Sequence, residues 1–293
     1  MNTNQGPARV TAVVCAHNPP PIWKTVVCRL AAHGLRTIVV DDASHPALAI
    51  PTTCSPSVEL LTSLSNIGLA AARNKALQHV DKEWVLFVDA DVLPDDAFLA
   101  RLPDVLTGSQ ADGVGFSVRE HHRQSDWDFY RACERDAFNN VHGRAEWVSG
   151  LLCAYRSDAL RAVNGFDPTF RTNGEDVDVG YRLTRVGKSL VRLPEVCGEH
   201  YRKDSIGSFL RMQYRYAFTA KWVDRSLYFP SPEIGRSPPL FRLRSVWPQI
   251  RLMLQFLARR PYAFYLPALI LCTMFSGACA GRKEVSRRLI RGY

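Results

Sequence analysis

The sequence predicts an α/β protein with a mainly parallel sheet flanked by helices, followed by a helical extension that associates with a membrane. Two observations support this prediction. Short β-branched apolar runs alternate with helically spaced segments over the first hundred residues, and the last third of the chain is both basic and apolar. A chain of 293 residues is long enough for one large domain with an appendage.

Strands and helices alternate through the first hundred residues. Residues 10–15 and 37–40 are β-branched runs that end in polar residues, and residues 22–32 between them have helical apolar spacing, so the three form a βαβ unit. The alternation continues with predicted strands at 58–61 and 84–88 and predicted helices at 69–79 and 95–106. Such connections produce parallel strands, and ligands bind at the carboxyl ends of those strands.

The pattern changes after residue 110. A strand is predicted at 113–118, followed by a polar and aromatic stretch at 121–147 and an apolar segment at 148–155. Helices are predicted at 158–163, 177–185 and 206–223, and a strand-like run at 195–199. Four prolines at 229–239 indicate a linker. We therefore expect one domain over residues 1–228 and a separate C-terminal region over 229–293.

Charge is distributed unevenly along the chain. Residues 1–200 carry 20 basic and 24 acidic side chains, whereas the remainder carries 17 basic and 4 acidic. The eight cysteines form no C-x-x-C pair, and the N-terminus has no apolar signal segment. These features predict a reduced, cytosolic body without structural zinc and a C-terminal third that binds a polyanion.

The polyanion is predicted to be a membrane. Residues 261–281 are uncharged and largely apolar, and Arg260 and Arg282 flank them. That arrangement suits an anionic lipid surface better than nucleic acid, and it predicts a location at the cytoplasmic face of the membrane. Three interpretations of the segment stay open: an interfacial helix, a single transmembrane helix, or an ordinary core or oligomer contact.

A pair of carboxylates follows the predicted strand at 84–88. Side chains at positions i and i+2 of a strand share a face, so Asp89 and Asp91 can converge on Mg²⁺ or Mn²⁺ and leave room for a substrate phosphate. The same residues also suit a solvated turn before the next helix. Other polar side chains fall at predicted strand ends too, which supports a single site: Asn18, Asp41 and Asp42.

Several ordered motifs narrow the chemistry. Neither a G-x-G-x-x-G fingerprint nor a Walker P-loop is present, so a phosphate must be held by metal and side chains. Six motifs follow in order along about two thirds of the chain: VTAVVCAHN at 10–18, IVVDDAS at 38–44, NIGLAAARN at 66–74, VDAD at 88–91, GFD at 165–167 and NGEDVD at 173–178. With these motifs the chain resembles the family 2 glycosyltransferases of the GT-A fold, which has a Rossmann-like sheet.

The resemblance implies a pocket for a nucleotide-sugar donor. It implies that Asp42 contacts the base or ribose, that Asp89 meets the ribose or the water shell of the metal, and that Arg73 approaches the nucleotide or diphosphate. Arg73 also suits an ordinary helix surface. Many relatives carry Thr or Ser at the position of Cys15. The residues implied at the donor are Cys15, His17, Asn18, Asp42, Arg73 and Asp89.

The resemblance also implies a cation and a base. Asp91 is the implied direct ligand of Mn²⁺ or Mg²⁺, and His200 stands where similar enzymes carry a histidine near the metal, although a lone histidine is often structural. Asp176 is the implied base that deprotonates the acceptor hydroxyl. Asn173 and Asp176 also form good helix-capping chemistry, and the two roles can coexist.

Three further residues are implied on the acceptor side: Trp147, Gly150 and Glu175. The ring of Trp147 can stack on a sugar, and a core position suits it equally. The run from Gln213 to Tyr216 departs from the Q-x-x-R-W motif of processive synthases, so no polymerase is predicted. The basic side chains of the 206–223 helix suit lipid phosphates or solvent equally.

The sequence therefore predicts an inverting, metal-dependent glycosyltransferase. It would move a sugar from a nucleotide-diphosphate donor to a saccharide or lipid-linked acceptor, in cell-envelope or exopolysaccharide synthesis. Nucleic acid is not an expected partner. The alternatives are a sugar-phosphate nucleotidyltransferase, for which a Gly-rich phosphate loop is missing, and a membrane-tethered saccharide-binding protein without turnover.

Overall fold

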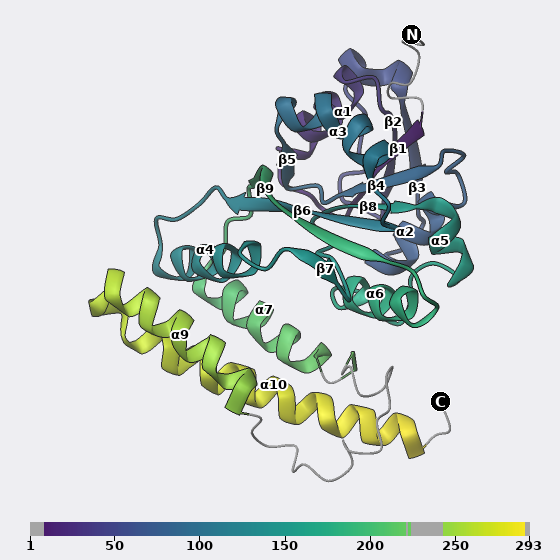
Figure 1. Cartoon of the computed structure of the whole chain (residues 1–293). Coiled ribbons are helices and arrows are strands. Elements are labelled where there is room, and N and C mark those ends of the chain that lie inside the picture. Colours follow the sequence, from purple (N-terminus) through teal and green to yellow (C-terminus); the bar gives the residue numbers. More distant parts are fainter. Residues whose placement is uncertain (1–8, 221, 224–242, 291–293) are drawn as a thin grey trace. The chain divides into compact units, whose positions relative to one another are not determined.

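The structure is a computed structural model that describes residues 9–220, 222–223 and 243–290 (Figure 1). The chain forms two compact units. Unit 1 comprises Met1–Arg119 and Val141–Tyr201, and unit 2 comprises Glu120–Asn140 and Arg202–Tyr293. The predicted domain boundary after residue 228 and the predicted linker at 229–239 lie outside the described residues.

The sheet is mixed. Within the described part of the chain its order is β3-β2-β1-β4-β8-β6-β9-β5, and β7 pairs with β9. The first four strands of that order are parallel, whereas β8, β6, β9, β7 and β5 enter through antiparallel pairs. The bounds are β1 Val10–Ala16, β2 Arg36–Asp41, β3 Val58–Thr62, β4 Trp84–Val88, β5 Val92–Pro94, β6 Gly113–Glu120, β7 Gly143–Ala145, β8 Leu152–Arg156 and β9 Leu190–His200.

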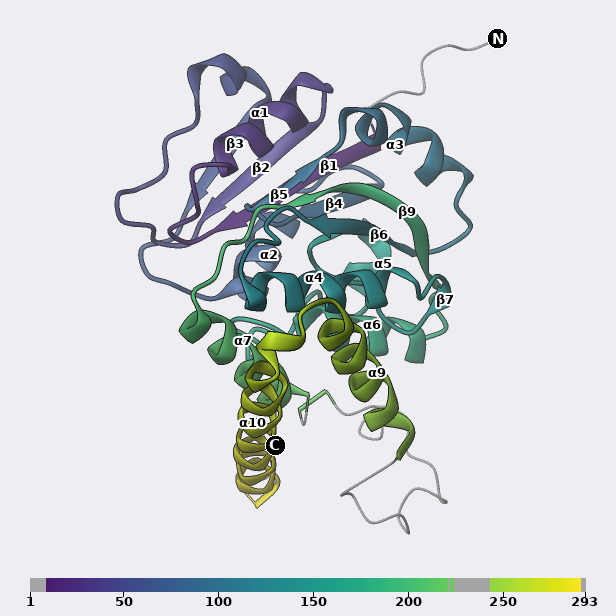
Figure 2. The ribbon, with the colours of Figure 1, turned by 90° about the vertical axis from the view of Figure 1, so that its left-hand side faces the viewer.

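Helices cover both faces of the parallel strands (Figure 2). β4 is buried at every position, as expected for a central strand with helices on either side. On one face, alternate residues of β1 pack with α1 (Trp23–Ala32) and α3 (Asp96–Gly108) in a single core. The other helices of unit 1 are α2 (Leu69–Leu77), α5 (Ser157–Ala162) and α6 (Glu175–Arg185). The α/β class is therefore confirmed, and its parallel part is the four-stranded N-terminal half.

Some elements differ from the predicted ones. The predicted strand at 195–199 is the end of the longer β9, and the predicted helix at 177–185 begins two residues earlier, at Glu175. Gly174 enables that start because it adopts the left-handed conformation at φ 90°. The strands β5 and β7 and a helix in the polar stretch 121–147 were not predicted.

Unit 2 is helical. It contains α4 (Asp126–Asn139), α7 (Ile206–Thr219), α9 (Leu243–Arg259), a short 3₁₀ turn η4 (Pro261–Ala263) and α10 (Tyr265–Ile290) (Figure 1). The predicted helix at 206–223 thus ends at Thr219. One apolar cluster joins all four α-helices, with Tyr130, Phe209, Phe256 and Leu266 fully buried. By length and composition Pro261–Arg282 can cross a membrane.

Glu134 on α4 gives unit 2 a pH-dependent stability. Burial raises the pKa of its carboxyl to about 7, despite a hydrogen bond of 2.8 Å from Nε2 of Gln213. The pKa is raised above the unfolded value, so this group favours folding below about pH 4.5, and that contribution is lost as the pH rises through 7.

We therefore expect Glu134→Gln to stabilise the protein by about 3 kcal/mol at pH 8 and by well under 1 kcal/mol at pH 4.5. The glutamine keeps an oxygen for Gln213 and never ionises. Urea unfolding of both proteins across this pH range measures the difference, and a difference independent of pH would contradict the assignment.

Candidate active site

The predicted site residues gather at the carboxyl ends of parallel strands. The register of β1 and β2 places Cys15 opposite Val40 and Ala16 opposite Asp41, so the loops after both strands leave the same edge. β4 pairs with β1 in parallel and delivers the loop of Asp89 and Asp91 to that edge. The sheet therefore brings together three segments that are spread over more than 70 residues of the sequence.

The loops after β1 and β2 are held to each other. Nδ1 of His17 lies 2.8 Å from the carbonyl oxygen of Asp42, and the backbone N–H of Asn18 donates to Oγ of Ser44. Oδ1 of Asn18 accepts from the backbone N–H of His45 at 2.7 Å. Asn18 has φ 48°, a left-handed conformation that asparagine tolerates. His17 and Asn18 thus shape this edge, and burial raises the pKa of the Cys15 thiol to about 12, which keeps it neutral.

Asp42 holds the loop that precedes α2 in place. Its two carboxylate oxygens accept hydrogen bonds from the backbone N–H groups of Ile67 and Gly68, at 2.7 and 2.9 Å. Gly68 has φ 90°, and a Cβ there would approach Arg171 to 3.0 Å, so a glycine is required. The carboxylate of Asp42 is 4% exposed and positions the start of α2. Its contact with a nucleotide stays a prediction.

Arg73, on α2, is the central buried cation of the site. It is 2% exposed, and it donates to Oε1 of Glu175 at 2.9 Å, to Oδ1 of Asp89 at 3.0 Å and to the carbonyl of Gly150 at 2.9 Å. Its guanidinium lies over the rings of two phenylalanines, Phe87 and Phe166, each at 5.4 Å from the ring centroid. Arg73 therefore joins α2, β4 and α6, and its direct contact with a donor stays a prediction.

The predicted base is connected to this arginine through one residue. The backbone N–H of Gly150 donates to Oδ2 of Asp176 at 2.9 Å, while the carbonyl of Gly150 accepts from Arg73. Oδ1 of Asp176 accepts from the backbone N–H of Val177 in the first turn of α6. A continuous hydrogen-bonded path thus runs from Asp89 through Arg73 and Gly150 to Asp176. A Cβ on Gly150 would lie 2.9 Å from Nη1 of Arg73, so a larger residue would displace the guanidinium.

Glu175 faces the protein interior. It is 3% exposed, one oxygen pairs with Arg73, and Oε2 has no hydrogen-bond partner among the described residues. Burial, with the neighbouring charge of Asp176, raises the pKa of Glu175 to about 8. The structure shows Glu175 as a buried partner of Arg73, and its contact with an acceptor stays a prediction.

Asp91 and His200 are two residues that could hold a cation. β5 pairs with the end of β9, with Val92 opposite His200, and Oδ2 of Asp91 lies 3.4 Å from Nε2 of His200. Burial raises the pKa of Asp89 to about 6, and Arg73 opposes this shift while the charge of Asp91 adds to it. A cation would relieve that repulsion.

No group of three or more His, Cys, Asp or Glu side chains suited to a metal is found in the described ranges. A site with few protein ligands is nevertheless the usual arrangement for Mg²⁺ and Mn²⁺ when substrate phosphates complete the coordination. The donor set of Asp91 and His200 therefore fits a divalent cation that is bound together with a diphosphate.

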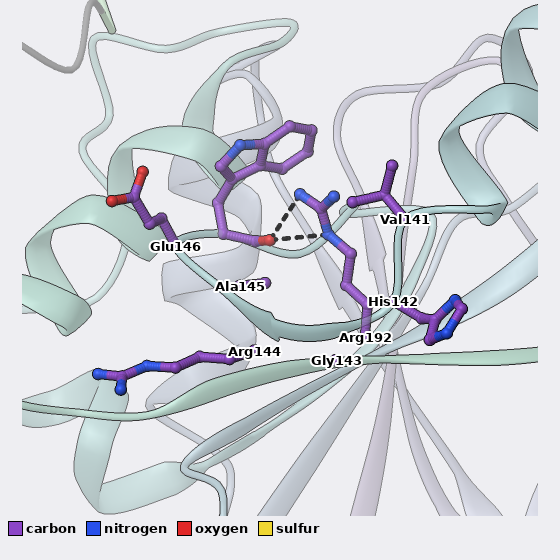
Figure 3. Close-up of a pocket in the computed structure, with 8 residues that line it drawn as sticks. Val141, His142, Gly143, Arg144, Ala145, Glu146 and Arg192 are labelled. Carbon is purple, nitrogen blue, oxygen red and sulfur yellow. Dashed lines mark hydrogen bonds between the residues drawn. The ribbon is translucent and has the colours of Figure 1, made fainter.

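A pocket lies beside Trp147 (Figure 3). Arg192 donates two hydrogen bonds to the carbonyl of Trp147, at 3.1 and 2.9 Å, and its guanidinium lies 4.4 Å from the centroid of that ring. The volume of about 240 Å³ suits a part of a ligand. Sequence reasoning missed Arg192, because an isolated arginine in a strand carries no motif. The pocket is lined by Val141, His142, Gly143, Arg144, Ala145, Glu146, Trp147 and Arg192.

Comparisons with known proteins agree with this architecture. The sequence profile of the family described as Glycosyltransferase like family 2 matches residues 7–219, well over half of the chain. The pre-mycofactocin glycosyltransferase of Mycobacterium tuberculosis (strain CDC 1551 / Oshkosh) is 29% identical over 228 residues, which cover 72% of this chain and 46% of that protein. Glycosyltransferase AglE of Haloferax volcanii is 28% identical over 171 residues, covering 56% and 54%. The chain spans about half the length of these relatives.

Solved structures share the fold. The mannosyltransferase PcManGT from Pyrobaculum calidifontis, in complex with GDP-Man and Mn²⁺, superposes with a TM-score of 0.57 at 20% identity and covers 97% of this chain and 81% of that one. S. aureus TarS 1–349 in complex with UDP-GlcNAc superposes with a TM-score of 0.51 at 14% identity, covering 94% and 92%. At these identities the likeness concerns the fold.

Proposed function

The chain belongs to glycosyltransferase family 2, and from this premise we propose that it transfers a sugar from a nucleotide-diphosphate donor to a hydroxyl of a saccharide or lipid-linked acceptor. The observation that supports this most directly is the path from Asp89 through Arg73 and Gly150 to Asp176, because it ties a donor-side carboxylate to an acceptor-side carboxylate. Family membership disfavours the nucleotidyltransferase alternative. The binding-only alternative is disfavoured by the presence of both Asp91 and Asp176.

We assign the base to Asp176. One carboxylate oxygen accepts the proton of the acceptor hydroxyl while the hydroxyl oxygen attacks the anomeric carbon from the face opposite the diphosphate, which inverts the configuration. The bond to the diphosphate breaks, and the nucleoside diphosphate leaves. The hydrogen bonds from the backbone N–H groups of Gly150 and Val177 hold the carboxylate of Asp176 in one orientation.

We assign the donor side to the edge formed by Cys15, His17, Asn18, Asp42 and Asp89. Asp91 and His200 would hold a Mn²⁺ or Mg²⁺, which stabilises negative charge on the departing diphosphate when it is bound. PcManGT was solved with GDP-Man and Mn²⁺, and GalNAc-T7 with UDP, GalNAc and Mn²⁺, which supports metal use on this fold. On the acceptor side, Trp147 at the pocket offers a ring for a sugar to stack on.

We further propose that the protein works at the cytoplasmic face of a membrane, in envelope or exopolysaccharide synthesis. The excess of basic residues after position 200 and the apolar segment Pro261–Arg282 support attachment to an anionic lipid surface.

Turnover tests the proposed function. The full chain is incubated with UDP-, GDP- and dTDP-sugars, Mn²⁺ and lipid and saccharide extracts, and the released nucleoside diphosphate is measured. We expect release from one donor class, with proton NMR showing an inverted anomeric centre in the product. Retained configuration would contradict Asp176 as a simple base. Pyrophosphate release from a nucleoside triphosphate and a sugar 1-phosphate, supplied in a parallel incubation, would indicate nucleotidyl transfer.

Asp91→Ala is expected to weaken binding of the Mn²⁺–donor complex at least tenfold, because one of the two protein ligands is lost. Titration with the donor, followed by electron paramagnetic resonance of free Mn²⁺, measures this. Asp96→Ala is the matched control, since Asp96 is an exposed carboxylate on the same segment that pairs with His33. Equal losses in both variants would remove Asp91 from the metal site.

A further inference from the structure

We propose that α10 lies in the plane of one membrane leaflet and does not cross the bilayer: its outward face enters anionic lipid while its inward face stays packed on α7. The inference rests on the membrane attachment proposed above and adds the orientation of α10 relative to the bilayer. All the contacts that carry it belong to unit 2.

The outward face of this segment is apolar and exposed. Phe264 is 72% exposed, Leu271 50% and Phe275 66%. Spacings of three and four residues place these side chains on one side of the helix. No charged residue occurs between Arg260 and Arg282, so a soluble protein would present this face to water without any charge. We define the outward face as Phe264, Ala268, Leu271, Cys272, Phe275 and Cys279, all exposed.

The inward face packs against α7 at close range. Leu266 and Ile270 are fully buried in the cluster that contains Phe209 and Met212 of α7. Further along, a Cβ on Gly277 would lie 2.4 Å from the carbonyl oxygen of Tyr214, and a Cβ on Gly281 would lie 2.4 Å from that of Phe218. The equal spacing of four residues on both helices lets the backbones touch. α7 therefore accompanies α10 along most of its uncharged length.

That packing makes a crossing orientation unfavourable. α7 carries Arg211, which is exposed, and Arg215, which is partly exposed. Gln213 of α7 bonds Glu134 of α4, so α7 is also tied to a polar side chain of a second helix. If α10 crossed the bilayer with α7 packed against it, Arg211 and Arg215 would enter the hydrocarbon, which is costly for each of them. An in-plane position keeps them on the water side.

The chemistry of the face selects lipid as its partner. α9 adds exposed Ile250 (39%) and Leu254 (60%) beside an exposed Arg251, a mixture typical of the interface between headgroups and acyl chains. The guanidinium of Arg260 is used within the protein and not for lipid headgroups. It donates to Oδ1 of Asp126 at 2.6 Å and to the carbonyl oxygens of Arg123 and Gln124. The bond fixes the corner between α9 and α10 and leaves their apolar faces exposed.

The depth of the outward face tests the proposal. Five variants of the full chain each carry one environment-sensitive label, at Phe264→Cys, Ala268→Cys, Cys272, Phe275→Cys or Cys279, with the other exposed cysteines changed to serine. Phosphatidylcholine–phosphatidylglycerol vesicles contain lipids with a quencher at the headgroup, at mid-chain or at the chain end. We expect all five labels at one shallow depth, roughly 5–10 Å below the headgroups.

A crossing helix gives a different profile. Because each residue rises 1.5 Å, the labels at 264 and 275 would differ in depth by about 16 Å, with the deepest label near the bilayer centre. Such a graded profile would overturn the in-plane geometry and leave the membrane attachment intact. Labels shielded without vesicles, together with a concentration-dependent dimer, would assign the face to a second copy of the chain and also overturn the proposal.

A substitution supplies the second measurement. Phe275→Glu is expected to weaken partition onto the same vesicles about tenfold or more, because an inserted ring is replaced by a charge. Val186→Glu is the matched control, since Val186 is 59% exposed in unit 1, and we expect less than a twofold change. Equal effects would overturn the proposal. Absence of vesicle binding by the unaltered chain would overturn both the attachment and its geometry, whereas donor turnover in solution tests the transferase separately.

Discussion

Asp176→Asn is expected to lower the rate of sugar transfer by about 10²–10⁴-fold while donor binding is unchanged. The asparagine oxygen can still accept the 2.9 Å hydrogen bond from Gly150, so the loop and the start of α6 should keep their conformation. What is lost is the capacity to take a proton from the acceptor. The measurement is kcat with the donor found by the turnover test, together with calorimetric titration of the same donor.

The control for this variant is Asp158→Asn. Asp158 is also an aspartate in the first turn of a helix of unit 1, and its Oδ1 accepts from the backbone N–H of Ala159. Asp158 is exposed and is not one of the predicted site residues, so we expect the variant's rate to equal that of the unaltered protein. A rate for Asp176→Asn within tenfold of the control would show that Asp176 only caps α6.

Arg73→Ala is expected to destabilise the protein by about 3 kcal/mol, because it leaves the buried Glu175 and the partly exposed Asp89 without their hydrogen-bonded partner. The carbonyl of Gly150 loses its partner too. Arg73→Lys restores a charge but not the fork that reaches three acceptors, so we expect it to recover part of the stability and little activity. Urea unfolding measures the first effect and kcat the second.

An exposed ion pair provides the comparison. Arg101 pairs with Glu195 at 2.8 Å, but the two side chains are 54% and 62% exposed, so Arg101→Ala should cost about 0–1 kcal/mol. If Arg73→Ala costs no more than Arg101→Ala, the buried network does not hold the site together. If Arg73→Lys retains full activity, Arg73 has no positioning role that depends on its geometry.

The sequence predicted the parallel half of the sheet well because its period is strong. The β-branched runs of β1 and β2 and the apolar run of β4 alternate with helical segments, so the local pattern of each element agrees with its structure in the fold. β5 and β7 were missed because three residues carry no measurable period. α4 was missed because Asp128 and Arg131 look like surface residues, whereas both are buried and paired with each other.

The candidate site was predictable in its location and less so in the roles of its residues. Polar residues after apolar strands indicated where Asp42 and Asp89 would lie. The sequence does not show which backbone N–H groups a carboxylate will meet, so the bonds from Ile67 and Gly68 to Asp42 could not be predicted. The inward orientation of Glu175 follows from long-range pairing with Arg73, 102 residues away.

For the C-terminal segment, too, the sequence predicted the location of a functional feature but not its geometry. Its lack of charge between Arg260 and Arg282 predicted contact with lipid, but the period of its apolar residues could not separate a crossing helix from one that is half-buried in protein. The close approach of Gly277 and Gly281 to α7, on which we base the in-plane proposal, could not be seen in the sequence. A sequence that is apolar on all sides therefore requires its packing partner before its orientation can be inferred.

The central claim is that the edge holding Asp42, Asp89, Asp91 and His200 binds a nucleotide sugar together with a divalent cation. The most direct measurement is calorimetric titration of the folded full chain with UDP-, GDP- and dTDP-sugars, with and without Mn²⁺. We predict that one nucleotide class binds, and only when Mn²⁺ is present. Failure of every nucleotide sugar to bind the folded protein with Mn²⁺ present would contradict the donor site.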